Sequence, residues 1–108
     1  MSRPYSQKFI DEVMNSDTRR VGVELAQHCV KANIPAKYVA VALGVSRATV
    51  HNWFRGNILR GKNEDMALAF IRLVKQDIDA GLLPAKSIKD AKAYICLLYT
   101  SDAADDTP

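Results

Sequence analysis

The sequence predicts an all-α fold, a compact bundle of five to six helices. Apolar residues recur at helical spacing along most of the chain, and no segment alternates between apolar and polar residues as a half-buried strand does. Glycine and proline fall where helices would begin and end. A length of 108 residues, of which 48% are hydrophobic, suits one domain with its own core and argues against a disordered chain.

Two helices are expected in the first third of the chain. Ser6 can cap the first, whose apolar side carries Phe9, Ile10, Val13 and Met14. A second helix is expected to run to about Ala32 from an N-cap at Ser16 or Asp17. Its apolar positions, spaced at i, i+4 and i+8, are Val21, Leu25 and Cys29.

A pair of short helices is expected in the middle of the chain. Pro35 opens the first of them, because a proline costs no hydrogen bond in a first helical turn. A turn at Gly44 and Val45 leads to the second, which spans about residues 46–55. Residues 56–61 then form a loop bounded by two glycines.

A long helix and a weaker one complete the predicted bundle. Asn63 is the expected cap of the long helix, with Glu64 and Asp65 in its first turn where the helix dipole favours acidic groups. Gly81 ends it, and its buried stripe is expected to be Met66, Phe70, Leu73, Val74 and Ile78. Pro84 is expected to open the last helix, with Ile88, Ala91 and Ile95 facing inward.

The tail from Cys96 resembles a translated transposon-based sequencing adapter. Residues 96–106 read Cys-Leu-Leu-Tyr-Thr-Ser-Asp-Ala-Ala-Asp-Asp, as the adapter does in one frame. The resemblance implies a non-native tail over 96–108 and a native C-terminus beyond about Ile95; a genuine acidic tail is the alternative. The expected organisation is therefore an N-terminal helix (1–16), a central domain (17–82), a truncated C-terminal helix (83–95) and this tail.

Composition excludes several classes of protein. Two cysteines are too few for a disulfide-stapled secreted scaffold or a four-cysteine zinc site. No apolar run reaches the roughly 18 residues of a membrane helix, and the N-terminus lacks the apolar stretch of a signal peptide. We therefore expect a cytoplasmic protein with no metal, no cofactor and no membrane partner.

Charge is unevenly distributed along the chain. No acidic residue lies between Glu24 and Glu64, whereas this stretch contains Lys31, Lys37, Arg47, Arg55, Arg60 and Lys62 together with His28 and His51. Such segregation is typical of a surface that meets phosphates, and a solvated face is the alternative. Setting aside Asp102, Asp105 and Asp106 of the tail makes the remaining chain more basic than its formal charge of +3.

Residues 36–55, AKYVAVALGVSRATVHNWFR, resemble the helix-turn-helix of the phage-repressor (Cro-like, or XRE) family. The matching structural positions are Ala40, Gly44, Val50 and Trp53. A small residue is needed where the two helices touch, and Gly44 accepts a left-handed turn conformation. Val39, Leu43 and Val45 are expected to face the core with Val50 and Trp53, while Phe54 lies at the edge of the packed face.

The resemblance implies that the helix at about 46–55 enters the DNA major groove. Its expected base contacts are Arg47, Ala48, His51 and Asn52. Its expected phosphate contacts are Lys37, Tyr38, Ser46, Thr49, Arg55, Asn57, Arg60 and Lys62. One position departs from the family, because Ala36 stands where many members carry a glutamine that grips phosphate and the recognition helix.

Together with the basic stretch, the resemblance implies a sequence-specific double-stranded DNA-binding protein. It would be a small phage or bacterial transcriptional regulator that can act as a homodimer, in the cytoplasm of a bacterial cell or a phage-infected host. We expect no enzyme, because no nucleophile, base or paired carboxylate occurs at the spacing of a known catalytic motif. Two alternatives remain open. One is a protein-interaction adaptor built on the same scaffold, and the other is the DNA-targeting part of a truncated recombinase or terminase subunit.

Overall fold

The computed structural model describes residues 5–16 and 20–99, and over these residues it contains six α-helices and no strand. The predicted all-α bundle is therefore confirmed. The helices are α1 (Gln7–Met14), α2 (Val21–Ala32), α3 (Ala36–Leu43), α4 (Arg47–Phe54), α5 (Lys62–Asp79) and α6 (Ile88–Tyr99).

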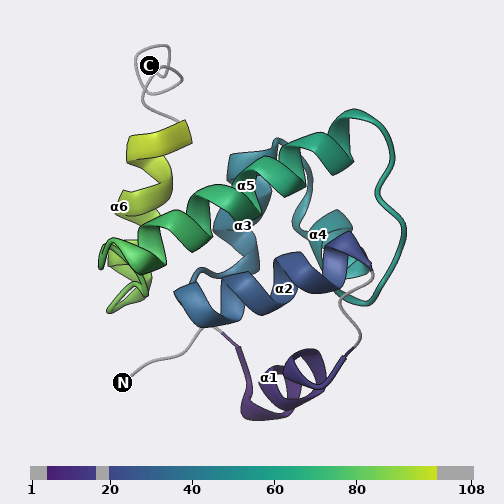
Figure 1. Ribbon diagram of the computed structural model, residues 1–108, viewed down its shortest axis with the longest axis horizontal. Helices are drawn as coiled ribbons and strands as arrows, with labels where there is room; N and C mark the ends of the chain where they lie inside the picture. Colours follow the sequence, from purple (N-terminus) through teal and green to yellow (C-terminus); the bar gives the residue numbers. More distant parts are fainter. Residues whose placement is uncertain (1–4, 17–19, 100–108) are drawn as a thin grey trace.

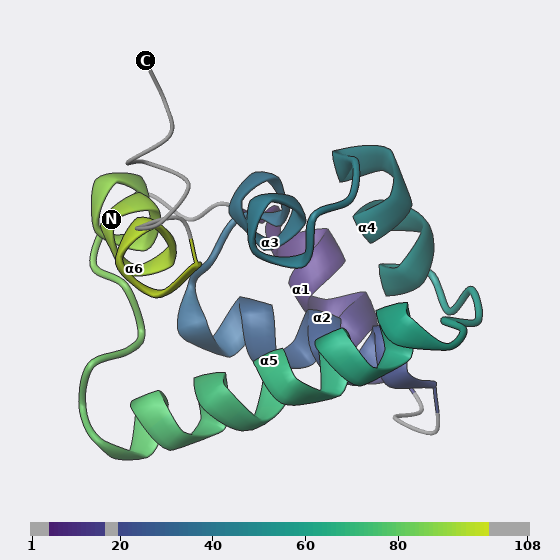
Figure 2. The same ribbon diagram turned by 90° about the horizontal axis from the view of Figure 1, so that it is seen from above.

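The long helix α5 crosses the molecule and packs along α2, which also contacts α1 and α4 (Figure 1). Helices α4 and α6 lie at opposite ends of the bundle with α3 between them, and both views agree on this order (Figures 1 and 2). Helix α3 packs on both α4 and α6. Helix α6 is therefore in direct contact with the α3–α4 pair through α3.

Two of the predicted helix caps are confirmed. The Ser6 hydroxyl accepts a hydrogen bond from the Phe9 amide at 3.2 Å and so begins α1. The Ser46 hydroxyl accepts one from the Thr49 amide at 3.1 Å and begins α4. Each bond satisfies one of the amides that a first helical turn leaves without a partner.

The predicted start of α2 is wrong. Helix α2 begins at Val21 with Arg20 as its N-cap, and no side chain caps it. Ser16 instead closes the end of α1, because its amide donates to the Val13 carbonyl and its hydroxyl donates to the Glu12 carbonyl. Asp17, the other expected cap, lies outside the described residues.

Two further helix starts differ from the predictions. Helix α5 has Gly61 rather than Asn63 as its N-cap, and the Gly61 carbonyl accepts from the Asp65 amide. Helix α6 begins at Ile88 rather than at Pro84, which precedes the helix. The Ser87 hydroxyl accepts from the Asp90 amide at 3.1 Å and so caps this later start.

The later start of α6 also corrects one predicted core residue. Ile88 stands in the first helical turn and is exposed, whereas Ala91 and Ile95 are completely buried as expected. Helix α6 continues past Ile95 to Tyr99. The helical backbone of residues 96–99 does not test the adapter resemblance of residues 96–108, which stays a prediction.

The core fills the space between α2, α3, α4, α5 and α6. Its largest completely buried side chains are Phe70, Leu25, Ile34, Ile95, Val39, Val50, Val74 and Cys29. The predicted stripe of α5 is confirmed at Phe70 and Val74, with Met66, Leu73 and Ile78 half-buried beside it. In the α2 stripe, Leu25 and Cys29 are completely buried and Val21 is half-buried.

Hydrogen bonds join the turn between α2 and α3 to residues from the N-terminal and the C-terminal parts of the chain. From the N-terminal side, the Tyr5 hydroxyl donates to the Ile34 carbonyl at 2.6 Å. From the C-terminal side, the Ala85 amide donates to the Ala32 carbonyl at 2.9 Å, and the Asn33 side chain donates to the Ala85 carbonyl at 2.8 Å. Asn33 adopts the left-handed conformation, which asparagine tolerates better than most residues.

The Tyr5 hydrogen bond makes the stability of the fold depend on pH in the alkaline range. Burial raises the pKa of the Tyr5 hydroxyl above its ordinary value of 10.0, and the nearby Cys29 raises it further. Because the folded protein holds the neutral phenol, this contribution to stability is complete below the unfolded pKa of about 10 and is lost as the pH rises above it. The loss amounts to about 1.4 kcal/mol per pH unit.

We therefore expect the stability advantage of the parent over a Tyr5→Phe variant to shrink at high pH. Near neutral pH the parent gains about 1 kcal/mol from the Tyr5 hydrogen bond. By about pH 11 this advantage is expected to have vanished, because only the parent must keep a buried phenol protonated. Urea unfolding of both proteins from neutral pH upward measures the difference, and two curves that stay parallel would contradict the proposed cause.

Candidate nucleic-acid interface

Helices α3 and α4 form a pair joined by a short turn, and their inner sides are fixed in the core. Gly44 takes the left-handed conformation that the turn was expected to need, with φ of 69° and ψ of 32°. The Val45 amide donates to the Ala40 carbonyl and closes the turn. Ala40, Val50 and Trp53 are buried, as predicted for the contact between the two helices.

Helix α2 packs closely against α4 on the inner side of the pair, a contact that no local signal in the sequence predicts. Gly22 of α2 lies against the backbone of Trp53, where an added Cβ atom would stand 2.1 Å from the Trp53 carbonyl oxygen. Only a glycine allows this distance. The same carbonyl accepts a hydrogen bond from the Gly56 amide at 2.9 Å, so the end of α4 is held from two sides.

Aromatic rings from α1 and the residues just before it contact Phe54 at the end of α4. The rings of Tyr5 and Phe9 are stacked at 5.2 Å between centroids, and both lie near Phe54, at 6.3 and 6.1 Å. Phe54 is buried, so this residue at the edge of the packed face belongs to the core. Tyr5 and Phe9 were not assigned this role from sequence, since their spacing to Phe54 is not local.

The outward side of α4 presents the residues expected to contact bases. Arg47, Ala48 and Asn52 are exposed, at positions that share one helical face. His51 lies on the same face but is half-buried, with its ring nearly perpendicular to the Phe54 ring and the two ring centroids 6.1 Å apart. The structure therefore brings the four residues together and leaves His51 the least accessible of them.

The residues expected to contact phosphates lie at both ends of α4 and at the start of α3. The hydroxyls of Ser46 and Thr49 bond to each other at 2.9 Å, so both already serve the cap of α4. Lys37 is exposed in the first turn of α3, with its ammonium nitrogen 5.5 Å from the ring centre of the half-buried Tyr38. Lys37 and Ser46 are therefore the exposed residues at this end, whereas Tyr38 and Thr49 are half-buried.

Beyond α4, the remaining predicted phosphate contacts lie at the C-cap of α4, in the following loop and at the start of α5. Arg55, Asn57, Arg60 and Lys62 are all exposed, as their expected role requires. The buried side chain of Leu59 anchors the loop, and the Asn57 amide donates to the Asn52 carbonyl at 3.1 Å. The loop therefore presents its polar side chains from a fixed backbone.

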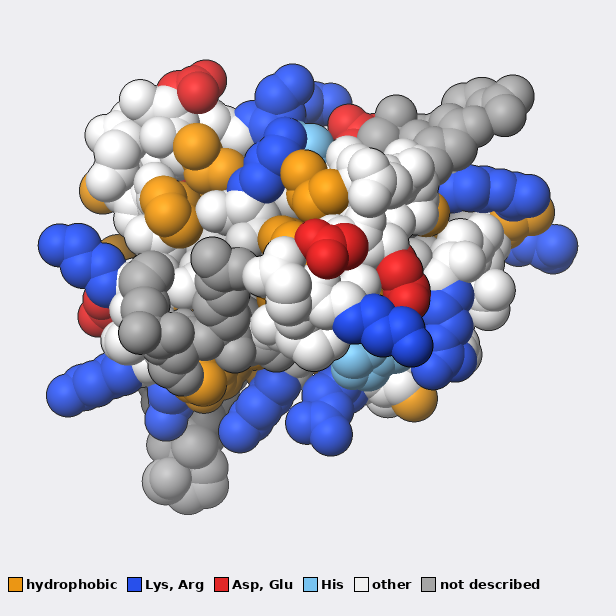
Figure 3. Space-filling model, turned by 90° about the horizontal axis from the view of Figure 1, so that it is seen from below, with side chains coloured by type: hydrophobic (Ala, Val, Ile, Leu, Met, Phe, Trp, Pro, Cys, Tyr) orange, Lys and Arg blue, Asp and Glu red, His pale blue; other side chains and the backbone are white. Residues whose placement is uncertain are grey.

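Positive charge dominates this part of the chain. On the face drawn in Figure 3, Lys and Arg side chains project around most of the outline, with Asp and Glu side chains among them. Glu24 and Glu64, which bound the stretch without acidic residues, are both half-buried. Exposed cations thus flank α4 along the chain, and the exposed Asp65 carboxylate follows them in the first turn of α5.

Within the described residues, no three His, Cys, Asp or Glu side chains gather closely enough to hold a metal ion. None of the described helices combines the length and the apolar character of a membrane span.

Comparisons with protein-family models, curated proteins and solved structures find no match to this chain.

Proposed function

We propose that the chain binds double-stranded DNA sequence-specifically, as a small transcriptional regulator that inserts α4 into the major groove. The observation that carries the proposal is the two-sided character of α4. One side is held by Val50, Trp53 and Phe54 in the core, while the other presents Arg47, Ala48 and Asn52 to solvent. A rigidly held helix with a polar outer face has the form that groove readout requires.

The chemistry of the outer face suits base edges. The Arg47 guanidinium can donate two hydrogen bonds to O6 and N7 of guanine, and the Asn52 amide can both donate to and accept from adenine. The Ala48 methyl can contact the methyl group of thymine. These three side chains would supply the sequence preference.

The surrounding cations suit the phosphate backbone. Lys37 precedes α4, whereas Arg55, Arg60 and Lys62 follow it. Contacts of this kind fix the position of a helix on DNA without reading its sequence. The resemblance to the phage-repressor family supports the same docking.

Selection from a pool of random DNA duplexes tests the proposal. We expect an enriched short motif, and a two-fold repeated motif with half-sites about one helical turn apart if the protein binds as a dimer. Recovery of duplexes without any enriched sequence would reject specific readout. Failure to retain duplex DNA at low salt would reject DNA binding and favour an adaptor role for the same surface.

Replacing Arg47 is expected to affect one base position. Arg47→Ala removes a bidentate contact to guanine and should weaken binding to the selected sequence by about 1–3 kcal/mol. The preference at that position should relax, while the free energy of unfolding stays nearly unchanged because the side chain is exposed. Competition binding against single-base variants of the selected duplex measures both effects.

Arg72→Ala is the matched control, since Arg72 is an exposed arginine of α5 outside the proposed interface. We expect it to leave the preference unchanged. If Arg47→Ala weakened all duplexes equally, Arg47 would be a phosphate contact and the proposed register of α4 would be wrong.

A further inference from the structure

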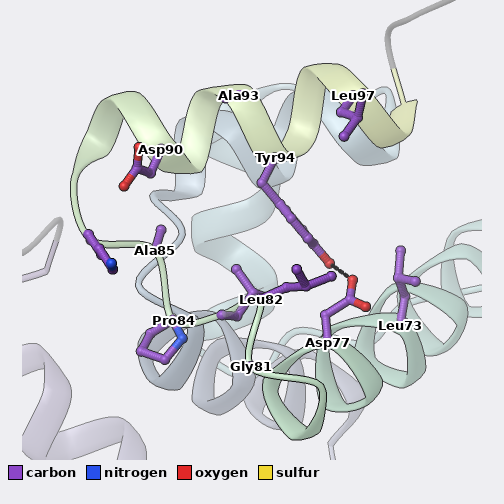
Figure 4. Close-up of a pocket in the computed structure, with 12 residues that line it drawn as sticks. Leu73, Asp77, Gly81, Leu82, Pro84, Ala85, Asp90, Ala93, Tyr94 and Leu97 are labelled. Atoms are coloured by element: carbon purple, nitrogen blue, oxygen red, sulfur yellow. Dashed lines mark hydrogen bonds between the residues drawn. The ribbon is translucent and has the colours of Figure 1, made fainter.

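A cavity of about 500 Å³ lies far from α4, between the C-terminal half of α5, the segment before α6, and α6 itself. Its walls include Leu73, Leu82, Leu83, Pro84, Ala93 and Tyr94. The volume falls within the range of small-molecule sites. Figure 4 shows the Tyr94 side chain reaching from α6 toward Asp77 on α5, with Leu82 beside them.

One polar pair is set into these apolar walls. The Tyr94 hydroxyl donates to Oδ2 of the half-buried Asp77 carboxylate at 2.5 Å. This bond joins α5 to α6 and fixes the orientation of the carboxylate. A carboxylate has about four acceptor positions, so Asp77 retains acceptor capacity beyond the phenol bond.

The charge at this cavity is opposite to that at the proposed DNA surface. Asp77 and Asp90 line it against a single basic residue, Lys86. The chain as a whole carries a formal charge of +3. A cation would therefore be drawn to this cavity, and an anion to the surface around α4.

Exposed apolar surface gives a ligand its second source of affinity. Leu82 is 68% exposed although it lines the cavity, and Leu83 beside it is buried. An apolar group seated against Leu82 would remove that surface from water. The cavity thus combines an apolar wall with a fixed carboxylate, which together match an apolar body carrying a cationic donor.

We propose that the α5–α6 cavity binds a small amphiphilic amine, with its ammonium group on Asp77 and its apolar body against Leu82 and Leu73. The ammonium donates to the carboxylate, and no covalent step is involved. Because no residue of α3 or α4 lines the cavity, the amine would bind whether or not the chain binds DNA. Bound ligand would bridge α5 and α6, and α6 packs on α3.

Titration of the full chain with tryptamine tests the proposal, with amide chemical shifts as the readout. Tryptophol and indole-3-acetate serve as neutral and anionic probes of similar shape. We expect tryptamine to bind with a Kd on the order of 1 mM, as befits a ligand of this size. Shifts should centre on α5 and α6, and the acid should bind at least about tenfold more weakly because it meets a carboxylate.

Two variants locate the site. Asp77→Asn keeps the shape and a hydrogen-bond acceptor but removes the charge, and should weaken tryptamine roughly tenfold. Asp79→Asn, an exposed acid of α5 outside the cavity, is the matched control and should change nothing. Ala93→Trp places a large side chain on the exposed cavity wall and should abolish binding of every probe while leaving Asp77 in place.

Several results would overturn the proposal. These are tryptamine shifts absent at about 10 mM, equal affinity for tryptamine and tryptophol, and binding indifferent to both Asp77→Asn and Ala93→Trp. A concentration-dependent dimer that covers the same amides and is blocked by Ala93→Trp would also overturn it. In that case the α5–α6 cavity would be part of an interface with a second copy of the chain. If Asp77→Asn failed to fold, Ala93→Trp and the acid probe would still decide the outcome.

Discussion

Gly22→Ala is expected to lower the free energy of unfolding by about 2 kcal/mol or more. The new methyl group would stand 2.1 Å from the Trp53 carbonyl oxygen and 2.7 Å from its carbonyl carbon. Both are backbone atoms, so no flexible side chain can move aside, and α2 and α4 must separate. Chemical denaturation of parent and variant measures the loss.

The sign of the change makes this test decisive. Alanine is a better helix former than glycine by about 1 kcal/mol, so the same substitution without the contact would stabilise α2. Gly44→Ala is the control, because its Cβ would meet open space and the cost there is only that of a left-handed alanine, about 1–2 kcal/mol. A Gly22→Ala variant as stable as the parent would show that α2 and α4 do not approach so closely.

Affinity for DNA is expected to fall steeply with salt. Four proposed phosphate contacts carry a full charge, namely Lys37, Arg55, Arg60 and Lys62. Because each neutralised phosphate releases counterions, four contacts give a slope of about −3.6 in log affinity against log salt. Raising monovalent salt from about 50 mM to about 200 mM should therefore weaken binding by about 150-fold, and a dimer with twice the contacts should double the slope.

Single charge removals show where that slope arises. Lys62→Ala should weaken all duplexes alike and reduce the slope by about 0.9, since it loses one phosphate contact. Lys92→Ala removes the same charge from an exposed position on α6, at the opposite end of the bundle from α4, and should leave the slope unchanged (Figure 1). Equal effects of the two variants would mean that net charge, and not a surface around α4, sets the affinity.

Local signals in the sequence were enough to predict the α3–α4 pair and the turn that joins its helices. Ser46 as cap, Gly44 as turn residue and the buried Val50 and Trp53 were all predicted, because each depends on neighbours only a few residues away. The exposure of Arg47, Ala48 and Asn52 followed from the same helical spacing. The outer face of the candidate site was therefore predictable from about twenty residues.

Features that depend on distant residues were not predictable in this way. Ser16 has the chemistry of a helix cap, but its carbonyl accepts from the buried side chain of Gln27 while its hydroxyl turns back to α1. Pro84 suits a first helical turn, yet the adjacent Ala85 is bonded to Ala32 and Asn33, which keeps this segment out of the helix. In both cases a tertiary bond overrides the local preference.

The two-sided bonding of the α2–α3 turn has a consequence for how the chain folds. Tyr5 reaches Ile34 across 29 positions of sequence, and Asn33 reaches Ala85 across 52. The polar groups of this turn are therefore satisfied only after the segments around Tyr5 and Ala85 have both packed against it. Such distant pairings slow folding and make it cooperative, because no half of the bundle satisfies the turn alone. Amide exchange at Ala85 should accordingly report the opening of the whole bundle rather than fraying of its C-terminal part.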